Sequence, residues 1–174
     1  MFIIIALILI IFILLMLVIG TIATGITPTP TSAAARKKIF EISSPHTPDS
    51  IAELGAGFGA MTFSYARQFP NAKITAYEMS WFPWMILLLR KLLFRYRNVY
   101  IIRKDFFKLD LTSHDFLYTY LYPGAMRKLS LKIHSHRKFT LVSNTFHLPD
   151  WSAAKKARVP HDLSSSCIYI YKKP

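Results

Sequence analysis

Three glycines and a carboxylate lie at a spacing that would bring bare backbone against a nucleotide-like ligand. A short apolar run ends at Glu53 and passes directly into a turn that carries Gly55, Gly57 and Gly59. Glycine adopts positive φ, has no Cβ to block a ligand, and leaves backbone N–H groups pointing at it. The apolar residues that follow are spaced as one face of a helix, which ends before Pro70. This order of strand, glycine turn and helix predicts an α/β domain whose binding site lies at the turn.

Two chemistries fit this motif. Gly55, Gly57 and Ala60 satisfy the loose dinucleotide fingerprint G-x-G-x-x-G/A. Read from Glu53, the same run resembles E/D-x-G-x-G-x-G, the first motif of Rossmann-like methyltransferases that bind S-adenosylmethionine (SAM). The acidic residue, the third glycine at the alternate spacing, and the lack of a second nucleotide-binding domain favour SAM. A glycine turn that only connects a strand to a helix remains the simpler alternative.

Two further carboxylates follow predicted strands downstream. Lys73–Glu78 is predicted to be the second strand, and a carboxylate at its end, Glu78, suits a ribose diol; Met79 follows it. Asn98–Ile102 is predicted to be the third strand, and Asp105 and Phe106 come shortly after it. An acidic side chain followed by an aromatic ring suits adenine, because the carboxylate accepts from the exocyclic amine and the ring packs on the base. A solvated carboxylate at a strand end is the alternative for Glu78, and an ordinary Asp turn is the alternative for Asp105.

The composition limits the class of protein. The chain has 174 residues, enough for one domain without an inserted substrate domain. Its 22 Lys and Arg against 9 Asp and Glu give a net charge of +13, which favours anionic lipid or acidic protein surfaces or nucleic acid. The single cysteine, Cys167, excludes an intramolecular disulfide and is predicted to be a buried thiol. No His or Cys cluster has metal-ligand spacing, so we expect no metal.

The N-terminal segment predicts a membrane anchor. Residues 2–19 are eighteen consecutive apolar residues, which as a helix would be roughly 27 Å long, close to the hydrocarbon thickness of a bilayer. A cleaved signal peptide is disfavoured because no basic residue precedes the run. Basic residues 36–38 follow it, so the positive-inside rule places the remaining domain on the cytoplasmic or organellar matrix side. We expect an anchor over 1–26, a Pro/Thr linker over 27–31, and one domain over 32–174.

Two serines precede predicted helices. Ser32 is expected to cap a helix over Ala33–Ile42, and Ser80 to cap a helix that continues through Trp84–Phe94. The second helix is apolar almost all round, whereas a surface helix shows a narrower stripe. A position between the sheet and neighbouring helices is favoured, and contact with a membrane interface is the alternative.

The remaining pattern completes one sheet. The predicted elements are strands Phe116–Tyr122 and Lys138–Asn144 with helix Ala125–Ile133 between them, then strands Ala157–Val159 and Cys167–Tyr171, the last antiparallel. The fold class is therefore α/β: a Rossmann-like, mostly parallel sheet with helices on both faces, preceded by one transmembrane helix.

Together these stretches resemble a particular family, the single-span methyltransferases related to the mitochondrial protein-lysine methyltransferases of the ATP synthase c-subunit and the adenine nucleotide carrier. The resemblance covers nearly the whole chain. It rests on Pro28–Pro30, Glu53–Gly59, Tyr77-Glu78, Pro83-Trp84, Asn98-Val99, Asp105–Leu111, Tyr120–Pro123 and Val142–Trp151. The family has G-S-G-D-G-R where this chain has Gly55–Ala60, so Phe58 replaces a polar residue of the turn.

The resemblance implies roles for individual residues. The three glycines of the turn would hold the methionine end of SAM, and Glu53 would anchor its amino group or hold the turn. Tyr120 would line the methyl channel as the catalytic position, while Thr29 and Pro30 would close over the cofactor. Glu78 would bind the ribose, with Met79 beside it, and Asp105 and Phe106 the adenine.

The implied reaction is in-line transfer of a methyl group from SAM to a lysine ε-amine of a membrane or membrane-proximal protein. Such a step needs positioning more than acid–base groups, and the lysine must be neutral to attack. A lipid amine or a small molecule remains open as the acceptor. The other functions left open are a nicotinamide-dependent oxidoreductase and a non-catalytic membrane adaptor with a degenerate cofactor site. We expect a monomer, contact with an anionic lipid surface, and no nucleic acid partner.

Overall fold

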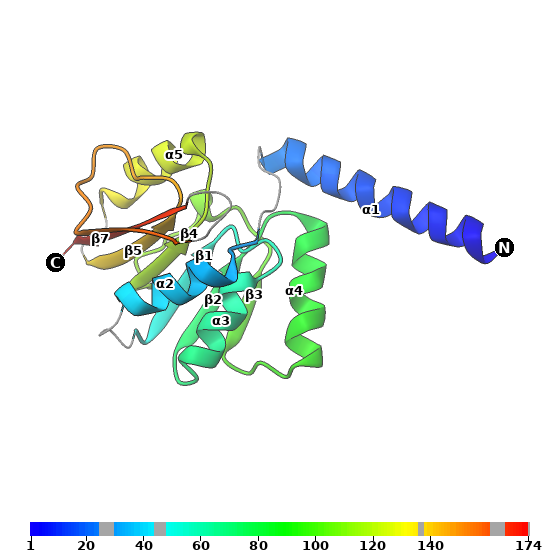
Figure 1. The fold of residues 1–174 in the computed structure, drawn as a ribbon, viewed down its shortest axis with the longest axis horizontal. Coiled ribbons are helices and arrows are strands. Elements are labelled where there is room, and N and C mark those ends of the chain that lie inside the picture. The colour runs from blue at the N-terminus through cyan, green and yellow to red at the C-terminus, as the bar shows by residue number, and fades with distance from the viewer. Residues whose placement is uncertain (25–29, 44–47, 136–137, 161–165, 174) are drawn as a thin grey trace.

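Seven strands form one sheet in a computed structural model of the chain (Figure 1), which describes residues 1–24, 30–43, 48–135, 138–160 and 166–173. The strand order is β3-β2-β1-β4-β5-β7-β6. The strands are β1 (Ser50–Leu54), β2 (Lys73–Tyr77), β3 (Val99–Ile102), β4 (Phe116–Thr119), β5 (Phe139–Asn144), β6 (Lys155–Arg158) and β7 (Cys167–Lys173). β1 to β5 pair in parallel, and β7 runs antiparallel to both β5 and β6. The predicted α/β sheet with an antiparallel last strand is confirmed.

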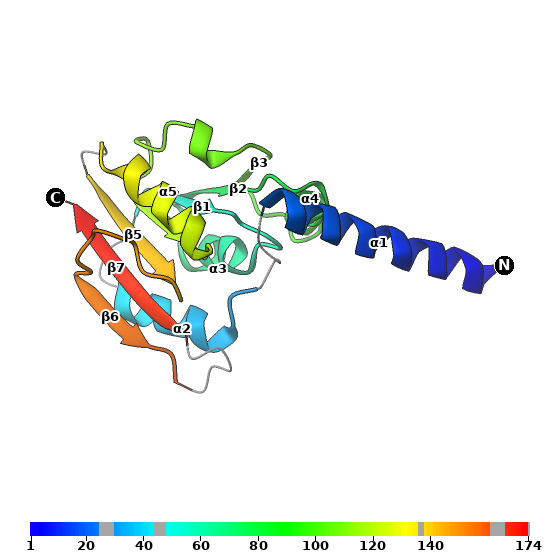
Figure 2. The ribbon, with the colours of Figure 1, turned by 90° about the horizontal axis from the view of Figure 1, so that it is seen from above.

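Helices cover both faces of the sheet. The helices are α1 (Phe2–Thr24), α2 (Ala33–Ser43), α3 (Ala60–Gln68), α4 (Trp81–Leu93), η1 (Phe106–Lys108, a 3₁₀ turn) and α5 (Pro123–Ile133). The apolar residues of α2, α3 and α4 pack on one face, and those of η1 and α5 pack on the other. Figure 2 shows α5 and α2 on opposite sides of the strands. Strand order reverses between β1 and β4, where ligands bind in open α/β sheets.

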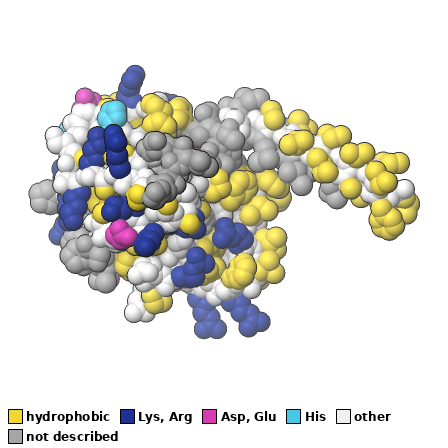
Figure 3. Space-filling view, in the orientation of Figure 1, with side chains coloured by type: hydrophobic (Ala, Val, Ile, Leu, Met, Phe, Trp, Pro, Cys, Tyr) yellow, Lys and Arg dark blue, Asp and Glu magenta, His cyan; other side chains and the backbone are white. Residues whose placement is uncertain are grey.

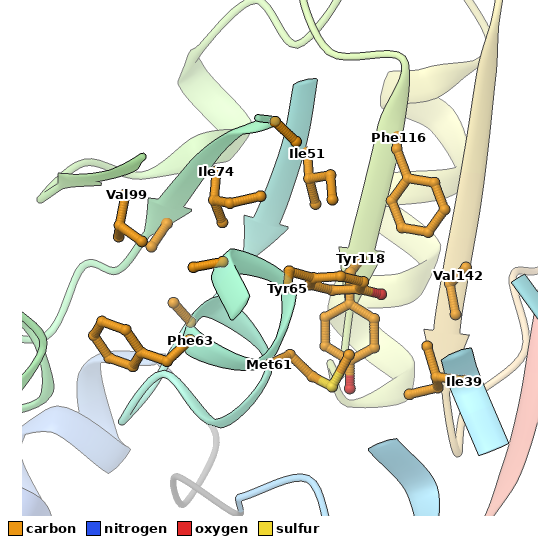
Figure 4. Close-up of a cluster of buried hydrophobic side chains, with 14 of the residues drawn as sticks. Ile39, Ile51, Met61, Phe63, Tyr65, Ile74, Val99, Phe116, Tyr118 and Val142 are labelled. Carbon is orange, nitrogen blue, oxygen red and sulfur yellow. The ribbon is translucent and has the colours of Figure 1, made fainter. Parts of the chain in front are cut away.

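The two cores follow from the alternation of side chains along each strand. Ile51 of β1 points toward α3, while Ala52 points to the opposite face. In the first cluster, Tyr65 of α3 packs edge-on against Phe116 and Tyr118 of β4 (Figure 4). Rings of this size, fully buried, hold α3 on the sheet and thereby set the position of the glycine turn that precedes it.

Several element predictions are confirmed, and three need correction. Ser32 caps α2, because its Oγ accepts from the Ala35 N–H at 3.1 Å. Ser80 occupies the N-cap position of α4 but makes no side-chain cap bond; its backbone N–H donates to the Glu78 carboxylate. β4 ends at Thr119, and Pro123 begins α5, since proline is favoured at the first helical position. Cys167 is partly exposed, because β7 alternates and Ile168 takes the buried position.

The N-terminal apolar run forms α1, which extends away from the sheet on the side where α4 lies (Figures 1 and 2). The first residues of this helix are largely exposed. Counted over the described residues alone, no helix combines the length and apolar content that crossing a membrane requires.

α4 has one buried and one exposed side. Pro83 and Leu87 are buried against the domain, with Arg90 one turn further along. The opposite side carries an exposed apolar row, which we call the α4 stripe: Trp81, Met85, Leu88, Leu89 and Leu92. The prediction that α4 is enclosed between the sheet and other helices is therefore wrong for this side, because these side chains are exposed.

Candidate functional site

A cavity of about 260 Å³ opens at the carboxyl ends of β1, β2 and β4. Its lining includes residues from the glycine turn, the ends of these three strands, Asp105 with η1, the start of α5 and the segment before α2. Nine of the predicted site residues line it: Pro30, Glu53, Gly55, Gly57, Glu78, Met79, Asp105, Phe106 and Tyr120. The residues that sequence reasoning did not include are Thr31, Ala56, Phe58, Ala60, Tyr77, Ser80, Phe107, Leu121, Tyr122, Ala125 and Lys128.

The three glycines of the turn differ in what surrounds them, although all have positive φ. A Cβ on Gly57 would meet nothing within 4 Å, so its backbone faces the open cavity. A Cβ on Gly55 would lie 3.2 Å from Leu121 of the cavity wall. A Cβ on Gly59 would lie 2.4 Å from Leu87 of α4. Gly59 does not line the cavity and instead packs against α4. Gly57 borders the space that a ligand would occupy.

Glu78 follows β2 and is held rigidly at the cavity edge. One carboxylate oxygen accepts from the Gly57 N–H at 2.7 Å, and the other accepts from the Ser80 N–H at 2.7 Å. The side chain is 7% exposed although it carries no ion pair among the described residues. Two backbone donors satisfy the charge, and each oxygen retains a lone pair for another donor. This geometry suits a pair of adjacent hydroxyls.

Asp105 follows β3 and caps the short helix η1. Its Oδ1 accepts from the Phe107 N–H at 2.9 Å, which fixes the carboxylate and leaves Oδ2 for a ligand. Phe106 and Phe107 lie next to each other with ring centroids 4.3 Å apart, and both line the cavity. A flat heterocycle with an exocyclic amine could pack on these rings and donate to Asp105.

Glu53 lies deeper than the other carboxylates, at the base of the cavity. Its side chain is 4% exposed and accepts a hydrogen bond from the Thr62 hydroxyl in the first turn of α3. Burial raises the pKa of the Glu53 carboxyl from 4.5 to about 8, and the hydrogen bonds from Thr62 offset part of this effect. Glu53 is therefore largely protonated at neutral pH.

The segment before α2 covers one side of the cavity. Thr31 is buried, and its hydroxyl lies 2.8 Å from the hydroxyl of Tyr118 on β4. Pro30 lines the cavity beside it. The predicted residue Thr29 lies outside the described residues. Sequence reasoning missed Thr31, and its position directly after Pro30 was the available signal.

Aromatic side chains form the remaining wall. Tyr120 lies just past β4, with its ring 6.4 Å from that of Phe146, and Tyr122 precedes α5. Lys128, one turn into α5, lines the cavity near these rings. The sequence Tyr120–Pro123 was a signal for this wall, whereas Lys128 had none because it belongs to an ordinary basic helix face.

Phe58, the departure from the family turn, connects the turn to α4. Its ring packs edge-on to Phe82 with centroids 6.2 Å apart, and its carbonyl accepts a hydrogen bond from Arg90. The Arg90 guanidinium also lies 4.4 Å from the centre of the Phe63 ring. The polar group lost at position 58 is thus replaced by packing, and the cavity stays open.

Comparison with known families agrees with this geometry. The family model for the ANTKMT methyltransferase domain matches residues 53–155, more than half of the chain. No curated protein sequence matches the chain at a significant level.

Solved structures share the fold. An RNA methyltransferase from Salinibacter ruber, in complex with S-adenosyl-L-homocysteine, is 20% identical over 84% of this chain and 94% of that chain, with a TM-score of 0.73. Magnesium protoporphyrin IX methyltransferase from Synechocystis PCC 6803, with bound SAM, is 13% identical over 81% and 80%, with a TM-score of 0.64. Precorrin-6y C5,15-methyltransferase from Geobacter metallireducens GS-15 is 15% identical over 80% and 86%, with a TM-score of 0.61. At these identities the matches show the fold alone.

Proposed function

Because the chain belongs to the ANTKMT methyltransferase family and is a SAM-dependent methyltransferase, we propose that it methylates a lysine ε-amine of a membrane or membrane-proximal protein. The observation that carries the cofactor assignment is the convergence of Glu78, Asp105 and the open backbone of Gly57 on one cavity. The lysine acceptor is supported by the family resemblance.

The residues present fit SAM. Glu78 would accept from the two ribose hydroxyls, Asp105 would accept from the adenine amine, and Gly57 leaves space where a Cβ would stand. Structures with the same fold contain SAM or its demethylated product. When bound, SAM supplies a methyl group already activated by the sulfonium charge. The protein then has to orient the acceptor and exclude water.

The cavity residues would favour methyl transfer to the lysine amine without supplying a general base. The rings of Tyr120 and Tyr122 would surround the approaching amine, and desolvation there lowers the pKa of a lysine so that it can lose its proton before attack. Glu53 would meet the α-amino group of the cofactor. A cation beside Glu53 favours its ionised form, so we expect cofactor binding to release a proton from this carboxyl.

We also propose that the chain is anchored in a membrane by α1, with the catalytic domain on the cytoplasmic or matrix side. This is supported by the eighteen-residue apolar run without charge and by the basic residues 36–38 that follow it. The large apolar side chains at the start of α1 are exposed, which is unfavourable in water.

The first experiment tests cofactor binding. Calorimetry of the full chain in detergent micelles should detect SAM binding, and Gly57→Arg should abolish it because the side chain fills the cavity. Leu131→Arg is the matched control, since it adds the same side chain at an exposed position of α5 and should bind normally. Equal binding in Gly57→Arg would contradict the site, and binding of NADH in place of SAM would support the oxidoreductase.

The second experiment tests the acceptor. Membranes from cells lacking this chain are incubated with methyl-labelled SAM and the purified protein, and peptides and lipids are then separated and examined by mass spectrometry. We expect label on lysine ε-nitrogen of a membrane protein. Label confined to lipid or to a small molecule would overturn the lysine proposal while leaving SAM binding intact.

A further inference from the structure

The outer side of α4 departs from the usual surface of a soluble domain. The α4 stripe runs from Trp81 to Leu92, about 16 Å along the helix axis at 1.5 Å per residue. Leu92 is 75% exposed and Trp81 is 55% exposed, and the apolar row continues into Leu93 and Phe94. Figure 3 shows these apolar side chains gathered over α4 next to the base of α1. A contiguous apolar row on one helix face indicates a binding surface.

The charges within the segment that carries this row are all of one sign. From Met79 through Lys104 the sequence carries six Lys and Arg and no Asp or Glu, while Glu78 and Asp105 at its two ends line the cavity. The Arg103 guanidinium stacks on Trp81, 4.0 Å from the ring centre. The Lys73 ammonium lies 5.0 Å from the centre of the exposed Tyr100 ring. A helix with an apolar stripe, a tryptophan and flanking basic residues matches the physics of a helix lying in an anionic bilayer interface.

The position of α1 is consistent with the same surface. The end of α1 contacts α4, and the two helix axes cross steeply in Figure 1. With α1 along the bilayer normal, α4 would lie along the bilayer surface with its stripe toward the lipid. The stripe and the apolar helix α1 therefore lie on the same side of the domain.

We infer that the α4 stripe docks the domain on the interface of an anionic membrane. Trp81, Leu89 and Leu92 enter the headgroup region, and Arg95, Arg97 and Arg103 contact lipid phosphates. Apolar side chains at the centre of the surface favour lipid over nucleic acid, whose phosphates are bound by polar and basic groups. The cavity opens beside this surface, because Met79 and Ser80 line it immediately before Trp81. Building on the proposed function, docking would hold the cavity within reach of lysines near the bilayer surface.

Tryptophan quenching by brominated lipid tests this inference on the full chain. The protein has three tryptophans, so two single-tryptophan versions are made: Trp84→Phe with Trp151→Phe keeps Trp81, and Trp81→Phe with Trp84→Phe keeps Trp151. Trp151 packs on Phe139 of β5, toward the other edge of the sheet from β3 and α4, and is the matched control. In brominated vesicles that contain phosphatidylserine, we expect quenching of Trp81 and not of Trp151. Equal quenching of the two would overturn the inference.

Two variants separate the apolar and electrostatic contributions. Leu89→Asp with Leu92→Asp should abolish the quenching of Trp81, and Arg95→Gln with Arg97→Gln should reduce it in phosphatidylserine vesicles but not in neutral ones. Both should bind SAM as the parent does, since neither pair lines the cavity. Failure of SAM binding in the parent would count against the proposed function and not against docking.

A spin label provides a second measurement that does not depend on tryptophan replacement. Leu92→Cys in a Cys167→Ser background carries a nitroxide at an exposed position that tolerates it. In anionic vesicles the label should become more accessible to oxygen than to a polar relaxant. A label that remains accessible to the polar relaxant, or that contacts the label of a second copy, would overturn the inference in favour of a free surface or a protein interface.

Discussion

The cavity edge and the α4 stripe depart from the usual distribution of side chains in opposite ways. At the cavity edge, Glu53 and Glu78 are charged residue types that lie buried. On α4, leucines and a tryptophan are exposed. Both arrangements cost free energy in an isolated domain, and charged residues are rarely buried unless partnered.

The two regions offset this cost differently. Glu78 is satisfied inside the domain by the Gly57 and Ser80 amides, and Glu53 by Thr62 and by holding its proton. The leucines and the tryptophan of the stripe remain exposed in the part of the chain that the structure describes, although Arg103 stacks on Trp81. The comparison indicates a cavity that is complete before its ligand arrives and a surface that is completed only by something outside the domain.

A large effect of one substitution is expected at the turn that joins the two regions. Gly59→Ala should lower the free energy of unfolding by about 3 kcal/mol, since its Cβ would enter Leu87 of α4 at a positive φ. Gly57→Ala should cost about 1 kcal/mol, from φ alone, because its Cβ meets open space. Urea denaturation in detergent micelles, followed by tryptophan fluorescence, measures both. Equal losses would show that the turn does not divide into a packing side and a ligand side.

Sequence reasoning predicted the cavity but kept an exposed face of α4 only as the alternative, for physical reasons. Gly57, Glu78 and Asp105 were predicted because local order along the chain places them at strand ends, and parallel strands bring those ends together. Thr31 and Lys128 were missed because their approach to the cavity depends on tertiary packing. The exposure of Leu92 could not be derived either, since an apolar helix reads the same whether its outer side is covered or not.

The next effect concerns the buried acid at the base of the cavity. Glu53 has a pKa raised to about 8 in the fold against 4.5 for its ordinary value, so the unfolded chain loses this proton first as pH rises. As the pH rises from 4.5 to about 8, the free energy of unfolding of the parent therefore falls. Above about pH 8 the carboxyl is ionised in both states, and its contribution to stability no longer changes with pH. Glu53→Gln has no titrating carboxyl at this position. Between pH 4.5 and about 8 its free energy of unfolding, relative to that of the parent, should therefore rise by about 1.4 kcal/mol per pH unit.

Denaturation curves at several pH values check this slope, and Glu41→Gln is the control. Glu41 is exposed and pairs with Lys38 at 3.2 Å on the surface. The stability difference between Glu41→Gln and the parent should stay nearly constant with pH, because an exposed pair contributes little. If the stability difference between Glu53→Gln and the parent did not change with pH, Glu53 would be ionised in the folded protein. The cavity would then hold a second charge.

A smaller effect is expected on cofactor affinity. Glu78→Gln should weaken SAM binding about tenfold, roughly 1.4 kcal/mol, because a charged acceptor for the ribose becomes neutral. Asp110→Asn is a suitable control: Asp110 accepts from the Thr112 N–H at 2.9 Å, does not line the cavity, and should leave affinity unchanged. Isothermal calorimetry distinguishes the two. An unchanged SAM affinity in Glu78→Gln would contradict the placement of the ribose beside Glu78.

The smallest effect belongs to the stripe, and it separates that surface from the core beneath it. Leu92→Ala should change the free energy of unfolding in detergent micelles by no more than about 0.5 kcal/mol, because the side chain is 75% exposed. Leu87→Ala, five residues earlier on the buried side, should cost about 3 kcal/mol. If Leu92→Ala proved as costly as Leu87→Ala, Leu92 would be covered within the folded chain. The stripe would then be part of the protein interior, and the contrast with the cavity edge would be lost.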